Sequence, residues 1–317
     1  MIQPATSKRP QAEIGEEQMD AETSQFDGTF TVDVEDYFQV SAFASVVSPK
    51  DWDHYECRVE QNTRKVLEIA AEAGTRGTFF ILGWVASRYP KLVTEIQNAG
   101  HEIGCHSQWH QLVYDLGPDR FRSDLRESRD TLQEITGTPI TLYRSPSFSI
   151  TRQSLWALDI LVEEGFHTDS SIYPIRHDRY GIPDAPAIPH IIKTTAGPLR
   201  EFPGMVYEFG RSKIPVGGGG YLRLFPWLMT KRLLTGICAK QRPLNVYIHP
   251  WEFDPDQPRL AGSLKSRFRH YQNLKTTAPK IRRMLKTFKL TTMSEVLDSC
   301  LGPQPSIYRP EFATNEA

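Results

Sequence analysis

The sequence predicts an α/β protein in which parallel strands alternate with helices. From residue 29 onwards, short apolar runs alternate with segments of helical spacing, which is the pattern of repeated β/α units. Glycines follow four of the helical segments, at Gly74, Gly100, Gly137 and Gly165, where a left-handed residue can end a helix. Six or seven such units favour a barrel, closed or incomplete, and an open doubly wound sheet is the alternative.

The first half of the chain gives the clearer pattern. Strands are expected at 29–34, 77–82, 101–105, 140–143 and 166–169, and helices at 59–73, 91–99, 119–136 and 154–164. The second half is less regular. It predicts loops around a short strand or two at 183–203, a helix at 226–240, a strand at 244–248 and a helix at 278–288.

Composition and charge limit the domains and the partners. The 317 residues suit one large domain or two small ones, and the formal net charge of -1 gives none of the basic excess typical of nucleic-acid-binding domains. Residues 1–28 are polar and acidic and lack the features of a secretory signal. We expect a cytoplasmic protein with a disordered tail at 1–28, one domain at 29–300 and a second tail at 301–317.

Three carboxylates close the first strand. Side chains alternate along a strand, so Asp33 and Glu35 point the same way, and two acids on one face favour a cation near them. A metal with its bound water fits this arrangement. The alternative is a polar strand end in which Asp36 caps the next turn.

A pair of histidines follows the third strand. His106 and His110 are four residues apart, so a helical turn would stack them on one face, close enough to bind one ion. Catalytic zinc sites use three protein ligands, and a carboxylate from residues 31–36 would complete the set. A chance pair among nine histidines is the alternative.

Three more polar segments follow predicted strands. Arg144 begins a segment that continues to Ser147 and Phe148, and an arginine can bind a carboxylate through two hydrogen bonds. Asp169 ends the strand at 166–169, and His249 follows the strand at 244–248. A histidine there is suited to be a general acid that Asp169 orients, although single histidines are more often structural.

Taken together and in this order, these five segments resemble the motifs of the polysaccharide deacetylases, the NodB-homology group of carbohydrate esterase family four. The resemblance extends from Asp33 to His249 and implies a deformed (β/α) barrel with about seven parallel strands. It implies that Asp33 is the general base, that His106 and His110 are metal ligands and that His249 is the general acid. It also implies that Arg144 holds the base and that Asp169 tunes the late histidine.

Two positions depart from the family pattern. Val34 stands where the second of two adjacent aspartates is usual, so the third ligand must be Glu35 or Asp36, and we favour Glu35 because it shares a face with Asp33. Ser147 stands where many members have tyrosine, and its backbone N–H could still stabilise an oxyanion. The segments 33–38 and 249–252 further resemble a subgroup that accompanies exopolysaccharide biosynthesis loci in bacteria with the exosortase system.

The resemblance implies hydrolysis of acetyl groups from N-acetylated sugars of a polysaccharide, with a divalent metal as cofactor, for which zinc fits the ligands best. The metal would activate a water and polarise the acetyl carbonyl, Asp33 would take the proton, and His249 would protonate the departing amine. The alternatives are an amidohydrolase of the same fold that acts on a small nitrogen compound, and an inactive glycan-binding protein.

Other residues indicate how a substrate could be held. Tyr37, Trp109, Phe148 and Trp251 lie next to motif residues and could stack on sugar rings, although aromatic residues are also common in cores. No Asp or Glu occurs from residue 257 to 293, while Lys and Arg recur. This basic extension could meet a polysaccharide, a lipid-linked oligosaccharide or a membrane surface, and a solvated helix face is the alternative.

Overall fold

The computed structural model describes residues 26–177, 179–210 and 212–310. Its strands are β1 Gly28–Val34, β2 Thr78–Ile81, β3 Glu102–Cys105, β4 Leu142–Tyr143, β5 Thr168–Asp169, β6 His190–Lys193, β7 Pro198–Glu201, β8 Val206–Phe209, β9 Ser212–Pro215, β10 Leu244–Ile248, β11 Leu290–Thr291 and β12 Ile307–Tyr308. Its helices are α1 Val59–Glu72, α2 Gly83–Arg88, α3 Pro90–Asn98, α4 Val113–Leu116, α5 Pro118–Thr136, α6 Trp156–Glu163, α7 Gly219–Leu224, α8 Trp227–Cys238, α9 Leu264–Tyr271, α10 Thr277–Thr287 and α11 Met293–Cys300.

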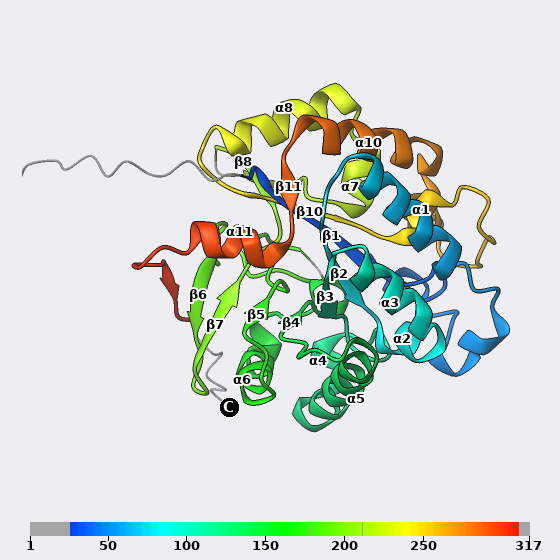
Figure 1. The fold of residues 1–317 in the computed structure, drawn as a ribbon, viewed down its shortest axis with the longest axis horizontal. Coiled ribbons are helices and arrows are strands. Elements are labelled where there is room, and N and C mark those ends of the chain that lie inside the picture. The colour runs from blue at the N-terminus through cyan, green and yellow to red at the C-terminus, as the bar shows by residue number, and fades with distance from the viewer. Residues whose placement is uncertain (1–25, 178, 211, 311–317) are drawn as a thin grey trace, which may run out of the picture.

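The main sheet contains a run of parallel strands in the order β10-β1-β2-β3-β4-β5-β7. Beyond β7, β6 runs antiparallel to it, and β12 pairs parallel with β6. In Figure 1 the helices surround these strands, with α8 and α10 above the sheet and α5 and α6 below it. The predicted barrel of about seven parallel strands is confirmed.

The barrel is closed by loops and side chains between β10 and β7. Asn245 on β10 donates from Nδ2 to the carbonyl oxygens of Phe202 and Pro203, at 3.2 and 3.0 Å. The N–H of Tyr247 on β10 donates to the carbonyl of Gly217, at 3.0 Å. A few bonds therefore replace a continuous ladder at this point, which makes the barrel a deformed one.

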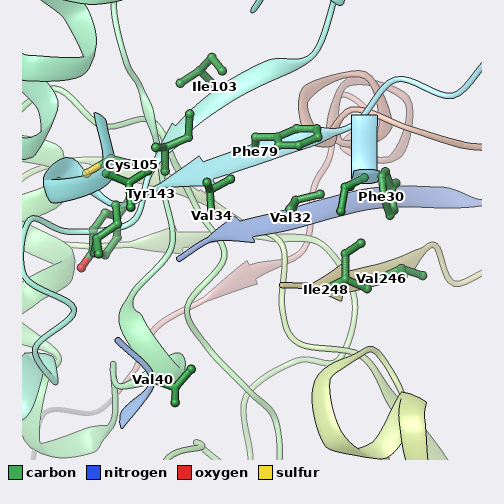
Figure 2. Close-up of a cluster of buried hydrophobic side chains, with 14 of the residues drawn as sticks. Phe30, Val32, Val34, Val40, Phe79, Ile103, Cys105, Tyr143, Val246 and Ile248 are labelled. Atoms are coloured by element: carbon green, nitrogen blue, oxygen red, sulfur yellow. The ribbon is translucent and has the colours of Figure 1, made fainter. Parts of the chain in front are cut away.

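The alternation of side chains along β1 explains where the site lies. Every residue of β1 is buried, as expected for a strand between two neighbours in a covered parallel sheet. Phe30, Val32 and Val34 pack in the apolar core together with Phe79 of β2 and Val246 of β10 (Figure 2). The intervening residues of β1 face the other way, into the barrel, and Asp33 is one of them.

The ends of the chain differ in part from the prediction. The expected disordered tail lies mostly outside the described residues, and Gly28, its last residue, already begins β1. The expected second tail starts with an ordered segment, because Ile307 and Tyr308 form β12. No helix of the described residues is both long and apolar enough to cross a membrane.

Candidate metal centre and catalytic pocket

A cavity of about 470 Å³ lies where several of the parallel strands end. Segments that follow β1, β3, β4 and β10 all contribute to its wall. The wall contains Asp33, Glu35, His106, His110, Ser147, Phe148, His249 and Trp251 among the residues predicted from sequence. The carboxyl end of the barrel strands therefore brings together segments that are far apart in the chain, as expected for this class of fold.

Asp33 and Arg144 form a buried ion pair. The Arg144 side chain is fully buried, and its Nη1 donates to Asp33 Oδ1 at 2.8 Å and to Thr31 Oγ1 at 2.7 Å. Its Nη2 donates to Ser170 Oγ at 3.0 Å, which fixes the guanidinium from the opposite side. Burial alone would raise the pKa of Asp33, but Arg144 holds it below its ordinary value. Asp33 is therefore a charged carboxylate held in one orientation.

Glu35, His106 and His110 form a buried three-residue cluster. One ligand atom from each residue lies within 4.8 Å of the others, and Glu35 Oε2 lies 2.6 Å from His110 Nε2. His106 Nδ1 lies 2.8 Å from the carbonyl oxygen of Arg144. A carbonyl can only accept, so Nδ1 donates and leaves Nε2 free as a ligand. Burial lowers the pKa of His106 to about 4, which keeps the imidazole neutral. This donor set fits a divalent metal.

The geometry distinguishes between the two candidate carboxylates. Asp36 accepts hydrogen bonds from the backbone N–H groups of Tyr37, Arg58 and Val59, at 2.8, 2.6 and 2.9 Å. It therefore fixes the start of α1 and is turned away from the histidines. Glu35 accepts from Trp251 Nε1 at 3.1 Å through Oε1, and its Oε2 faces His110. The structure thus favours Glu35 as the third ligand.

The histidines are brought together by a loop, so the predicted helical turn at 106–110 is wrong. Residues 106–110 form no helix, and Ser107 and His110 adopt positive φ angles of 66° and 50°. Asp124 of α5 holds the loop by accepting from the N–H groups of Gln108 and Trp109 at 2.9 and 3.2 Å. The left-handed residues cost conformational energy, which the buried contacts of the loop must offset.

His249 lies beside Asp33 and Glu35 in the cavity wall. Its Nε2 is 3.8 Å from Asp33 Oδ2 and 3.8 Å from Glu35 Oε1, and its Nδ1 is 3.1 Å from Glu252 Oε1. Burial alone would lower the pKa of His249, but Glu252 and the other carboxylates outweigh it and raise the pKa to about 9. A cation at Glu35 would offset part of this rise. The histidine is placed to act as a proton donor.

The structure corrects the expected partner of His249. Asp169 accepts a hydrogen bond from Ser171 Oγ and faces Glu201, which lies directly opposite on β7. The buried carboxylate at His249 is Glu252, three residues further along the chain. The sequence contained this signal, because a short helical turn after β10 brings residues three apart together.

Two of the four predicted sugar-stacking residues lie elsewhere. Phe148 and Trp251 line the cavity. Tyr37 is buried, with its ring centroid 5.2 Å from that of Phe38, and Trp109 packs against Trp52 at 6.0 Å. Tyr37 therefore lies in the core, whereas Trp109 lines a second cavity whose wall also includes His110.

The basic extension also reaches the site, which the sequence did not predict. Lys265, Phe268, Arg269 and His270 of α9 line the cavity. Arg223 of α7 lines it too, and its guanidinium lies 5.1 Å from the Trp251 ring centroid. The extension therefore forms part of the cavity wall.

Comparison with family models divides the chain into two parts. Residues 52–161 match the model described as polysaccharide deacetylase. This part of the chain is therefore similar to polysaccharide deacetylases. Residues 170–298 match a second model, a domain of unknown function named DUF3473. The first matched region contains His106, His110 and Arg144, whereas the second contains His249 and Glu252.

Curated relatives match over short stretches. A peptidoglycan-N-acetylglucosamine deacetylase of Bacillus cereus is 30% identical over 98 residues, which are 31% of this chain and 36% of the relative. The peptidoglycan-N-acetylmuramic acid deacetylase PdaA of Bacillus subtilis is 31% identical over 84 residues, 26% of this chain and 32% of PdaA. The matched segment thus spans about a third of the length of these relatives.

A solved structure matches over nearly the whole chain. It is a Mycobacterium smegmatis protein described provisionally as a polysaccharide deacetylase, with a TM-score of 0.61 and 19% sequence identity. The match covers 92% of this chain and 96% of that chain. The similarity extends through the DUF3473 region and establishes a common fold.

Proposed function

We propose that this protein is a metal-dependent deacetylase that hydrolyses the acetamido groups of N-acetylated sugars. The observation that carries the proposal is the single cavity in which the Asp33–Arg144 pair, the cluster of Glu35, His106 and His110, and His249 meet. A carboxylate base, a cation site and an acid are the groups that metal-assisted amide hydrolysis requires.

Asp33 is the base in this proposal. Arg144 keeps Asp33 charged and pairs with its Oδ1 atom. The Oδ2 atom of Asp33 therefore faces the cavity and His249. His249 is the acid, because its Nε2 points toward Asp33 and Glu35 while Glu252 accepts at Nδ1. The base and the acid thus approach one reacting centre from different strands, as the attack of water and the departure of an amine require.

Glu35, His106 and His110 would hold the metal, and zinc suits two nitrogen ligands and one carboxylate. A divalent ion bound there would supply Lewis-acid chemistry by polarising a carbonyl and lowering the pKa of a water molecule. Ser147 lines the cavity, and we assign its backbone N–H to the developing oxyanion. Phe148 and Trp251 offer apolar surface to a sugar ring.

The substrate is a polysaccharide or a lipid-linked oligosaccharide in this proposal. A role in exopolysaccharide biosynthesis follows from the resemblance of residues 33–38 and 249–252 to the exosortase-associated subgroup. The B. cereus and B. subtilis relatives carry names that refer to peptidoglycan sugars, which supports an N-acetylated glycan as the substrate class.

The test is acetate release from N-acetylglucosamine oligomers by the purified protein loaded with zinc. We expect release that a chelator abolishes, and we expect Asp33→Asn or His106→Ala to lower the rate by a factor of about 100 or more. His54→Ala removes an exposed histidine and serves as the matched control. Activity that survives chelation and His106→Ala would refute the proposal. Acetate released from small amides but not from the oligomers would instead favour a small-molecule amidohydrolase.

A further inference from the structure

Five large apolar side chains are exposed on α7, α8 and α9. Leu264 and Phe268 on α9 are 83% and 64% exposed, and Leu224, Leu228 and Met229 on α7 and α8 are 48%, 80% and 45% exposed. We call these five residues the rim face. Isolated apolar residues are ordinary on a protein surface, but such a group on adjoining elements marks a site of interaction.

Contacts between α7 and α9 hold the rim face together. Arg223 of α7 donates to the carbonyl oxygens of Arg269 and His270 on α9. Leu224 and Phe268 both line the mouth of the catalytic cavity. Leu228 and Met229 begin α8, directly after the turn that follows Leu224. The rim face therefore adjoins the entrance of the cavity.

The charged side chains on the helices of the rim face are all basic. Helices α7, α8, α9 and α10 contain no acidic residue. The exposed cations beside the apolar residues are Lys231, Arg232, Lys265, Arg267 and Arg269. Within the described residues, none of these five forms an ion pair. Because the whole chain has a formal net charge of -1, this basic region implies an uneven charge distribution that would orient the protein toward an anionic partner.

We propose that the rim face docks on an anionic lipid membrane. Exposed Leu and Phe side chains flanked by Lys and Arg are the arrangement that inserts apolar groups at the headgroup level and pairs cations with lipid phosphates. A second copy of the chain fits less well, because an isologous contact would bring two basic faces together with no acidic residue on these helices to pair with them.

Docking in this way places the cavity entrance at the bilayer surface. The rim-face residues Leu224 and Phe268 and the neighbouring cation Lys265 all line the cavity as well. A glycan carried on a membrane lipid would reach Asp33 without leaving the surface. The docking does not rest on the proposed function, because lipid binding requires no metal and no turnover.

The experiment is co-sedimentation of the full chain with vesicles. We expect binding to vesicles of phosphatidylglycerol and phosphatidylcholine in physiological salt, and little binding to phosphatidylcholine alone. Leu264→Ser/Phe268→Ser and Lys265→Glu/Arg269→Glu should each weaken binding by about tenfold or more. Ile188→Ser/Ile307→Ser removes two apolar residues exposed elsewhere, at 41% and 60%, and should bind like the wild type.

Three results would overturn the proposal. One is the absence of binding to the anionic vesicles, and another is equal binding by Leu264→Ser/Phe268→Ser. The third is sedimentation equilibrium showing a dimer that Leu264→Ser/Phe268→Ser dissociates, which would make a second copy the occupant. Thermal unfolding of each variant checks that the fold is kept. Asp33→Asn should bind vesicles like the wild type, which separates docking from catalysis.

Discussion

At the scale of single residues, the environment of His249 is the feature that most changes the expected chemistry. A histidine acid needs a partner that fixes its tautomer and stabilises the charged ring. The resemblance assigned that role to Asp169, but the carboxylate 3.1 Å from His249 Nδ1 belongs to Glu252, whose side chain is fully buried. Arg223 Nε lies 3.7 Å from the same Glu252 oxygen and helps to hold it in place.

We therefore predict that Glu252→Gln lowers kcat for acetate release by a factor on the order of 10–100 with little change in KM, because the amide keeps the shape but not the charge. Asp169→Asn should leave kcat within about threefold of the wild type, since Asp169 is bonded to Ser171 instead. Steady-state kinetics of both variants on one oligomer give the comparison. The reverse order of effects would return the tuning role to Asp169.

At the scale of elements, β5 and β7 place two acids side by side. Asp169 and Glu201 are register partners on these parallel strands, and both are buried. Burial raises the pKa of Asp169 to about 6, and burial together with repulsion from Asp169 raises the pKa of Glu201 further. Asp169 Oδ2 and Glu201 Oε2 have no other hydrogen-bond partner within the described residues. The raised pKa values and the facing oxygens therefore favour a proton held between the two carboxyls.

The sign of the pH dependence follows from these raised pKa values. The stability that protonation of the pair contributes is complete below the pKa of an unfolded carboxyl and declines as pH rises. The contribution of Asp169 is lost as pH rises through about 6, and the contribution of Glu201, whose pKa is higher, is lost only at a higher pH. Glu201→Gln removes the decline that Glu201 causes, because an amide can donate to Asp169 at any pH. We expect the variant to gain on the order of 1 kcal/mol over the wild type in free energy of unfolding between pH 5 and pH 8. Urea unfolding at both values measures this, and an equal difference at the two pH values would contradict it.

The loop at 106–110 brings the two histidines together in a way that the sequence pattern does not predict. Spacing alone predicted that His106 and His110 meet, and they do, with ring centroids 5.3 Å apart. The helical turn that was to bring them together is absent, because Asp124, from a helix further along the chain, binds the loop N–H groups. A contact between distant elements cannot be read from the periodicity of a five-residue segment.

At the scale of the whole molecule, apolar runs alternate with helical segments, and this pattern was sufficient to predict β1 to β5 and β10. The reason is that strands buried in a parallel sheet are apolar along their whole length. The second half was harder to predict. In the glycine run 217–220, for example, a Cβ on Gly218 would lie 2.0 Å from the carbonyl oxygen of Tyr247. That glycine allows close packing against β10, which no local pattern reveals.

The arrangement of the strands in the barrel explains which site residues could be predicted from the sequence. Asp33, His106, Arg144 and His249 directly follow or end strands, so the topology alone brings them to one cavity. The cavity wall contributed by α9 depends on how the second half folds back over the first, through bonds such as those of Arg223 to α9. Tyr37, adjacent to the acidic motif, faces the core because the chain turns there.

The proposed function depends on one metal ion held by Glu35, His106 and His110. Native mass spectrometry of the zinc-loaded protein tests it most directly, with Asp36→Asn as the matched control for Glu35→Gln. We expect one zinc ion per chain in the wild type and in Asp36→Asn, and a loss of most of the bound zinc in Glu35→Gln and in His106→Ala. Zinc retained by His106→Ala, or lost from Asp36→Asn while Glu35→Gln keeps it, would contradict the assignment.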